Sequence, residues 1–122
     1  MATHSFRTAL ETRDLGAAEA LLADDVIFRS PVVFKPYHGR DAMRGILAAV
    51  FQVLDDWRCV RELGTPDGRD QALVFEARIG DRQIEGCDFM RRDESGSIVE
   101  FYVMVRPLSG ALALAEAMEA QL

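Results

Sequence analysis

Hydrophobic residues near the amino terminus recur at the spacing of helices. Between Thr3 and Arg13 the apolar residues fall on one stripe, namely Phe6, Ala9 and Leu10. Asp14 has the side chain of a helix N-cap, and apolar residues after it continue a second short helix: Leu15, Ala18, Leu21 and Leu22. The pattern therefore predicts a helical hairpin, which the pair Asp24-Asp25 ends.

A short strand and the most regular helix follow. Residues 26–30 have the pattern of a strand, which Pro31 and a predicted turn at 36–39 bring to an end. From Asp41, which we interpret as a cap, apolar residues recur on one broad face: Met43, Ile46, Leu47, Val50, Phe51 and Leu54. This face must pack on another apolar surface.

Strand patterns fill most of the second half of the chain, at 57–63, 72–79, 83–92 and 97–106. Turn-forming sequences separate these strands, at 65–68, 80–81 and 93–96. Because the links are short, adjacent strands should pair as antiparallel hairpins. Pro107 ends the last strand, and Ser109 is the expected cap of a final helix. Helices followed by a strand meander predict an α+β domain, not an alternating βαβ one.

The strands also indicate which sheet face is covered. In residues 73–79 every odd position is apolar, whereas the even positions include Glu76 and Arg78, so one face should meet the helices. The last strand is less one-sided. Tyr102, Met104 and Phe89 would leave apolar area on the outer face, which we expect a homodimer to cover.

Composition narrows the possible functions. The 122 residues suit one domain, spanning 1–122, and the net charge of -6 argues against a nucleic-acid partner. The chain shows neither a signal-peptide pattern nor a long uncharged apolar run, so we expect a cytoplasmic protein without membrane contact. His4 and His38 belong to no metal-ligand cluster, and no cofactor motif is visible, so we expect chemistry without metal or cofactor.

Short motifs between residues 4 and 107 carry a family resemblance: Phe6-x-x-Ala9-Leu10-x-x-x-Asp14-Leu15, residues 21–26, Ser30-Pro31, Gly39-Arg40-x-Ala42, and Gly86-x-Asp88-x-x-Arg91 followed by Gly96-x-Ile98. They resemble the NTF2-like superfamily, and within it the SnoaL-like polyketide cyclases and ketosteroid isomerases. The resemblance implies an NTF2-like (cystatin-like) cone, in which a curved antiparallel sheet wraps around the N-terminal helices. One apolar pocket would hold a small apolar, aromatic or polycyclic ligand.

The resemblance and the apolar pattern together place eleven residues at that pocket: Phe6, Phe28, Ser30, Tyr37, Met43, Leu47, Trp57, Met90, Phe101, Val103 and Val105. Concave, mostly apolar sites with a few polar groups are typical for small ligands. Two of the polar residues have an alternative interpretation. Tyr37 is either at the pocket mouth or in a solvated turn, and Ser30 bonds either a ligand or the local backbone.

The ketosteroid isomerase site is preserved only in part. By the resemblance, Ser30 stands where that family has its proton-shuttling aspartate, and Phe6 stands where it has a tyrosine donor. Asp88 alone matches, as the second donor to the oxyanion. We therefore expect no ketosteroid isomerisation. In the similar polyketide cyclases an acid at the position of Asp88 acts as general acid/base.

Asp88 shares one face of its strand with Ile84, Gly86 and Met90, so it should lie in apolar surroundings with a raised pKa. The alternative is an aspartate that pairs with an arginine or faces solvent. Two hypotheses follow. The chain is a cofactor-independent cyclase or isomerase that uses Asp88 as general acid/base on an enolisable carbonyl compound, or it is a non-catalytic ligand-binding domain.

Overall fold

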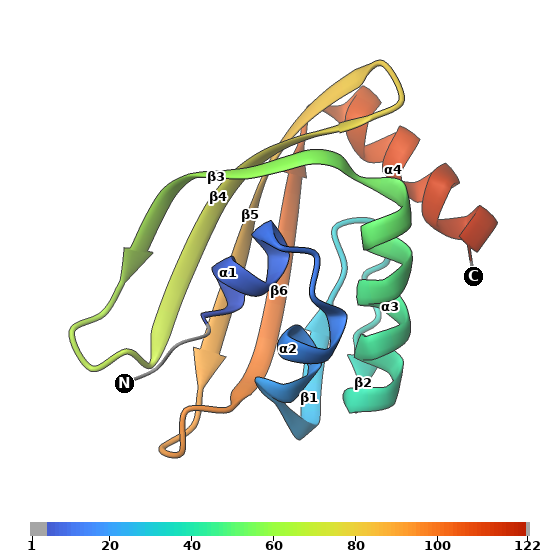
Figure 1. Cartoon of the computed structure of the whole chain (residues 1–122). Coiled ribbons are helices and arrows are strands. Elements are labelled where there is room, and N and C mark those ends of the chain that lie inside the picture. Colours follow the sequence, from blue (N-terminus) through green and yellow to red (C-terminus); the bar gives the residue numbers. More distant parts are fainter. Residues whose placement is uncertain (1–4, 122) are drawn as a thin grey trace.

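The computed structural model describes residues 5–121 as a six-stranded sheet with four helices (Figure 1). The elements in chain order are α1 (Phe6–Glu11), α2 (Leu15–Ala20), β1 (Leu22–Arg29), β2 (Tyr37–His38), α3 (Arg40–Val53), β3 (Asp55–Gly64), β4 (Asp70–Ile79), β5 (Arg82–Arg92), β6 (Ile98–Arg106) and α4 (Leu108–Gln121). The strand order in the sheet is β2-β1-β6-β5-β4-β3. Helices α1, α2 and α3 lie on one side of the sheet, and α4 crosses near one end.

Side-chain caps account for the helical hairpin. The Ser5 hydroxyl accepts a hydrogen bond from the Thr8 backbone N–H at the start of α1. The predicted cap of α2 is confirmed, because an Asp14 carboxylate oxygen accepts from the Ala17 N–H at 3.0 Å. Each bond satisfies a backbone donor that the first helical turn leaves without a partner.

The predicted caps of the other two helices are wrong. Helix α3 starts after Gly39, whose φ of 99° suits a residue without a side chain, and Asp41 lies inside the first turn. A carboxylate in that turn still faces the positive end of the helix dipole. Helix α4 begins at Leu108, one residue before Ser109, so Ser109 lies within its first turn and is not the cap.

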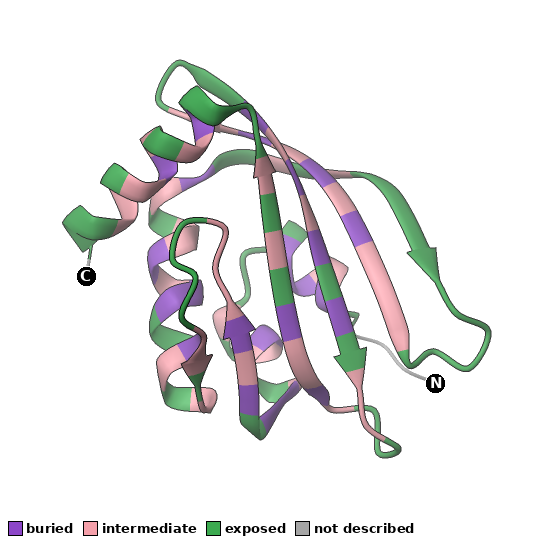
Figure 2. Cartoon of the chain, turned by 180° about the vertical axis from the view of Figure 1, so that it is seen from behind, coloured by how far each residue is buried: buried purple, intermediate pink, exposed green. Residues whose placement is uncertain are grey.

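The antiparallel meander is present as predicted. Strands β3, β4, β5 and β6 pair antiparallel with their sequence neighbours. Leu73, Phe75 and Ala77 are buried on the inner face of β4, as the alternation predicts. Figure 2, which views the sheet from the side away from α1 to α3, shows buried residues alternating with more exposed ones along β5.

The first two strands differ from the prediction. Strand β1 begins at Leu22 and runs through Asp24-Asp25, with a register shift between Leu22 and Ile27. The exposed Asp24 carboxylate pairs with Arg40 at 3.1 Å, so both charges stay at the surface. Residues 37–38 form β2, antiparallel to β1, instead of a turn. Strand β1 pairs parallel with β6, so the sheet is mixed and not purely antiparallel.

Packing of aromatic and aliphatic side chains joins the helices to the inner sheet face. The Phe6 and Phe101 ring centroids lie 5.0 Å apart, and Phe28 lies 6.0 Å from Phe101. Met43, Ile46 and other apolar residues of α3 are buried against this cluster, as the broad apolar face of that helix requires. None of the described helices is long and apolar enough to cross a membrane.

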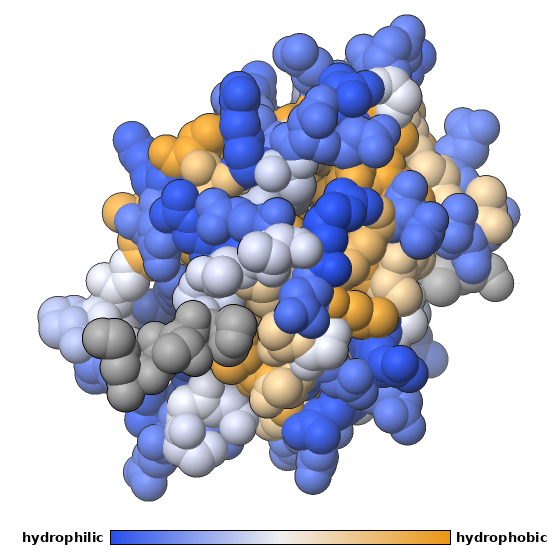
Figure 3. Space-filling view, viewed as in Figure 1, coloured by the Kyte–Doolittle hydropathy of each residue, from blue (hydrophilic) through white to orange (hydrophobic). Residues whose placement is uncertain are grey.

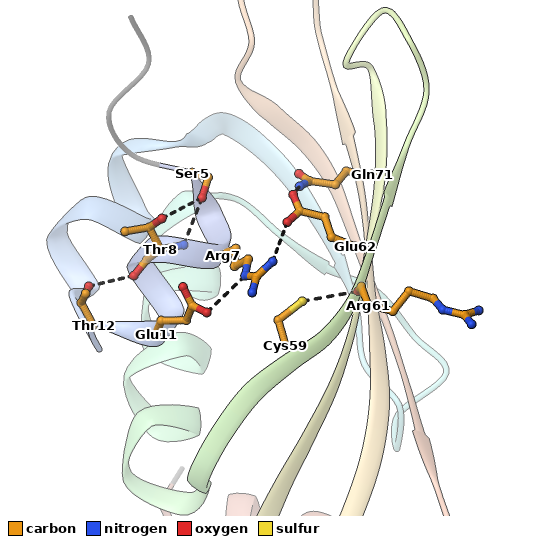
Figure 4. Close-up of polar contacts among 9 residues, drawn as sticks. All are labelled: Ser5, Arg7, Thr8, Glu11, Thr12, Cys59, Arg61, Glu62 and Gln71. Atoms are coloured by element: carbon orange, nitrogen blue, oxygen red, sulfur yellow. Dashed lines mark hydrogen bonds and ion pairs between the residues drawn. The ribbon is translucent and has the colours of Figure 1, made fainter.

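Polar contacts fasten α1 to the sheet outside the core (Figure 4). The Arg7 guanidinium pairs with Glu11 on its own helix at 3.1 Å and with Glu62 on β3 at 3.0 Å. The Gln71 amide of β4 donates to Glu62 at 2.6 Å. These exposed charges contribute little stability singly, but together they fix the position of α1 on the sheet.

Candidate functional site

A cavity of about 430 Å³ lies between α3, α4 and the inner face of the sheet, a volume suited to a small organic ligand. Its walls are mainly apolar, with residues from nearly every element: Leu10, Phe28, Pro31, Val32, Val33, Met43, Ile46, Leu47, Val50, Phe51, Leu54, Trp57, Phe75, Ile84, Phe101, Val103, Val105, Leu114, Ala115 and Met118. Polar side chains are few: Arg13, Ser30, Tyr37, Asp88 and Glu119. On the helix side, hydrophobic surface is visible between hydrophilic side chains (Figure 3).

Asp88 is the buried charged residue of this cavity. It lies on the inner face of β5, paired in register with Leu73 on β4 and Val103 on β6, and is 5% exposed. Among residues 5–121 no group forms a hydrogen bond or ion pair with its carboxyl group. Burial away from water raises the pKa of Asp88 to about 8, because the charged form loses its solvation. The carboxyl group is therefore mostly protonated at neutral pH.

An aromatic wall lies beside Asp88. The rings of Trp57 and Phe75 stack with centroids 5.7 Å apart and an interplanar angle of 26°. Gly86, two residues before Asp88, makes room for this stack. A Cβ atom on Gly86 would lie 2.4 Å from the Phe75 Cζ and 2.8 Å from the Met104 carbonyl oxygen. Only glycine lets the Phe75 ring lie this close to β5.

The cavity brings together most of the residues that the sequence pointed to: Phe28, Ser30, Tyr37, Met43, Leu47, Trp57, Asp88, Phe101, Val103 and Val105. Phe6 and Met90 do not belong to its lining. Both are buried in the adjoining hydrophobic core, where the Phe6 ring packs on Phe101 and fills the space between α1 and the sheet. Tyr37 packs on Phe28 with ring centroids 6.1 Å apart.

Ser30 contacts the local backbone while it lines the cavity. Its Oγ accepts hydrogen bonds from the backbone N–H groups of Val32 at 3.0 Å and Val33 at 3.2 Å, which shapes the turn after β1. Arg29 of β1 pairs with Tyr102 of β6, so the next residue, Ser30, lies beside Val103. Val103 in turn pairs with Asp88 of β5, so strand β6 lies between Ser30 and Asp88. Two strand spacings put the Cα atoms roughly 10 Å apart, too far for Ser30 and Asp88 to share a proton directly.

Sequence reasoning missed two charged lining residues, Arg13 and Glu119. Glu119 belongs to α4, whose cavity side also carries Leu114 and Met118; their four-residue spacing is visible in the sequence, but the place of α4 on the sheet is not. Arg13 lies between two short helices and carries no local signal. Residues 5–121 contain no group of three or more His, Cys, Asp or Glu side chains arranged to hold a metal ion.

The fold and the cavity define an NTF2-like α+β protein of the ketosteroid isomerase-like kind, as the sequence resemblance implied. The SnoaL-like domain family matches residues 3–101, and the chain belongs to this family. No curated protein matches the chain.

Solved structures support this assignment. A steroid delta-isomerase from Pseudomonas aeruginosa is 43% identical with a TM-score of 0.88, covering 93% of this chain and 82% of that chain. An uncharacterized protein with a cystatin-like fold from Silicibacter pomeroyi is 34% identical with a TM-score of 0.89, covering 95% and 81%. An epoxide hydrolase/cyclase-like enzyme of pyran ring formation in the polyether salinomycin is 14% identical, with a TM-score of 0.70 over 86% and 87%, and shows the fold alone.

Proposed function

We propose that this chain is an enzyme of the isomerase or cyclase type, which acts on an apolar carbonyl compound with Asp88 as general acid/base and without a cofactor. One observation carries the proposal: a buried carboxyl group, to which none of the described residues 5–121 bonds, lines an apolar cavity. Burying such a group costs free energy unless a ligand uses or satisfies it. Strongly perturbed titratable groups in clefts are characteristic of functional sites.

The chemistry follows from the protonation state. Because its pKa is about 8, Asp88 holds a proton at neutral pH and donates a hydrogen bond to a carbonyl oxygen in the cavity. During enolisation or ring closure that oxygen gains negative charge. The Asp88 O–H bond breaks as its proton moves to the oxygen, and the other carboxyl oxygen of Asp88 accepts the proton lost from the adjacent carbon, so that Asp88 ends protonated. General acid catalysis of this kind contributes about 10²–10⁴-fold to a rate. The apolar walls exclude water and so strengthen the interaction.

The similarity to a Pseudomonas aeruginosa steroid delta-isomerase supports the class of chemistry, proton transfer next to a carbonyl group. The steroid reaction itself is not what we expect of this chain. Ser30 has no histidine or carboxylate partner among residues 5–121 to make it a base, and Phe6 is a core residue without a donor. With a Δ5-3-ketosteroid as substrate, the absorbance of the conjugated enone product should increase no faster with the protein than without it.

A non-catalytic ligand-binding domain is the second candidate. Ser30 lies about two strand spacings from Asp88, and no titratable group of the described residues bonds to the Asp88 carboxyl group. The lack of such a second group favours the binding domain. In that case Asp88 only hydrogen-bonds its ligand. The two candidates differ in one measurable property, because a binding domain does not accelerate proton transfer.

Proton exchange tests the proposal directly. Purified protein is incubated in D₂O with cyclic ketones, such as α-tetralone and androst-4-ene-3,17-dione, and deuterium incorporation next to the carbonyl is followed by NMR. We expect exchange above background, loss of it in Asp88→Asn, and no loss in Glu85→Gln. Glu85 is the matched control because it is a carboxylate on the outer face of the same strand, paired with Arg106. Binding without exchange in the wild type would favour the binding domain.

We propose that two copies of the chain associate through the outer sheet face. Phe89, Tyr102 and Met104 are 42%, 39% and 52% exposed there, and the Phe89 and Tyr102 rings meet edge to face at 6.3 Å. Cross-strand register puts Phe89 beside Tyr102 and Cys87 beside Met104, so the apolar side chains form one patch. A homodimer removes this patch from water.

A further inference from the structure

The proposed function leaves two charged residues of the cavity lining without a role, Arg13 and Glu119. Arg13 lines the same cavity as Asp88 but is exposed to solvent, so it lies at the cavity mouth. It is the one cation in the lining that residues 5–121 provide. The guanidinium group is therefore within reach of a ligand that fills the cavity.

The guanidinium group of Arg13 is held in place by α3. Its Nη1 donates a hydrogen bond to the Leu54 carbonyl oxygen at 3.2 Å, and its Cζ lies 5.7 Å from the centroid of the Phe51 ring. Leu54 and Phe51 also line the cavity. A cation over an aromatic face and a carbonyl bond together restrict a side chain that is otherwise free to move.

The backbone of Arg13 adds a further observation. Its φ of 55° is left-handed, at the position where helices most often end with glycine. The Arg13 N–H donates to the Leu10 carbonyl and the Asp14 N–H donates to the Ala9 carbonyl, the two bonds of a Schellman helix end. Glycine would satisfy this turn with less strain. Arg13 thus carries a long side chain at a backbone position that favours glycine.

The donors of Arg13 are largely unused. A guanidinium group has five N–H donors, and the structure assigns one of them to Leu54. No carboxylate of residues 5–121 pairs with Arg13, whereas Arg7 and Arg29 both pair with glutamates. The planar group matches a carboxylate with two parallel hydrogen bonds.

We propose that Arg13 binds the carboxylate of an amphipathic ligand whose apolar body fills the cavity and whose carbonyl end reaches Asp88. The carbonyl end of this inference rests on the proposed function. The other charges around the cavity are compatible with such a ligand. Asp88 is mostly neutral at neutral pH and does not repel an anion, and Glu119 is an exposed side chain of α4. Removing the Glu119 charge should therefore leave anion binding unchanged or strengthen it.

A matched pair of competitors tests the proposal. The neutral fluorophore N-phenyl-1-naphthylamine reports cavity occupancy, and 4-phenylbutanoate and its methyl ester displace it at pH 7. In Arg13→Gln the affinity for the acid should fall about 10- to 100-fold, the range for a charge-assisted hydrogen bond, while the ester is unaffected. Arg82→Gln is the control, because Arg82 is an exposed arginine outside the cavity. Arg13→Gly, which suits the left-handed backbone, should reproduce the loss in a stably folded chain.

Each result decides between the two proposals. If Arg13→Gln and Arg13→Gly keep the wild-type ratio of acid to ester affinity, the carboxylate proposal is overturned while the cavity keeps its proposed function. An equal loss for acid and ester also overturns it, since Arg13 would then only shape the cavity. If wild-type protein binds neither the fluorophore nor the competitors, both proposals fall. Asp88→Asn should leave the acid-to-ester ratio unchanged, which separates the two ends of the ligand.

Discussion

Replacing Asp88 by asparagine should change how the stability of the protein depends on pH. The pKa of Asp88 is about 8 in the folded protein because of burial, against 3.8 for an aspartate in water. Between these values the folded state holds one proton more than the unfolded state. The free energy of unfolding therefore falls as pH rises, by about 1.4 kcal/mol per pH unit.

The size of the effect makes it measurable. The contribution of Asp88 is fully present below about pH 4 and is lost progressively as the pH approaches 8. Across that interval the loss is on the order of 5 kcal/mol, which is comparable to the whole stability of a marginal domain. Asp88→Asn keeps the shape and polarity of the side chain but does not ionise. The free energy of unfolding of the variant should therefore increase relative to that of the wild type as the pH rises.

Urea denaturation at several pH values tests this reasoning. Wild type, Asp88→Asn and Asp93→Asn are unfolded between about pH 5 and pH 8 at one protein concentration, because association also affects stability. Asp93 is the control: hydrogen bonds from Ser95 and neighbouring backbone groups lower its pKa, so its contribution is constant in this range. Parallel curves for wild type and Asp88→Asn would refute the buried, unpartnered carboxyl group.

Further predictions follow from the same residues. If Asp88 acts as general acid, the rate of proton exchange should fall as pH rises through about 8; a rate that rises instead would make it a base. Gly86→Ala should destabilise by about 1–3 kcal/mol through its clash with Phe75, whereas Gly45→Ala, in an open helical position, should stabilise by about 0.5–1 kcal/mol, both by chemical denaturation. Met104→Glu should give a monomer in sedimentation at micromolar concentration, and a wild type that is already monomeric would contradict the dimer.

The part of the fold that the sequence predicts best is the meander. Strand β4 alternates apolar and polar residues without a break, and short turns leave its neighbours only one way to pair. The parallel pairing of β1 with β6 had no such signal. More than sixty residues separate the two strands. In the sequence the polar pair Asp24-Asp25 looks like an interruption, but β1 accommodates it at exposed positions through a register shift between Leu22 and Ile27.

The candidate site likewise contains residues that the sequence predicts and residues that it does not. Asp88 was predictable because a charged residue stands alone on the apolar face of a strand, between Gly86 and Met90. The apolar residues of α3 and β6 followed from periodicity. Arg13 and Glu119 were not predictable, since each reaches the cavity only through the way a helix packs. Phe6 is the reverse case, a residue that the family resemblance placed at the pocket but whose ring packs in the hydrophobic core.

Gly86 helps to explain why the Asp88 carboxyl group stays protonated in this cavity. Gly86 lets the Phe75 ring lie against β5, and the stacked Trp57 extends an apolar wall beside the carboxyl group. The wall keeps away the water that would otherwise lower the pKa of Asp88. A variant that displaces Phe75, such as Gly86→Ala, should therefore do more than destabilise the fold. If it lets water reach Asp88, the carboxyl titration followed by NMR should move toward acidic pH, although the substitution adds no charge.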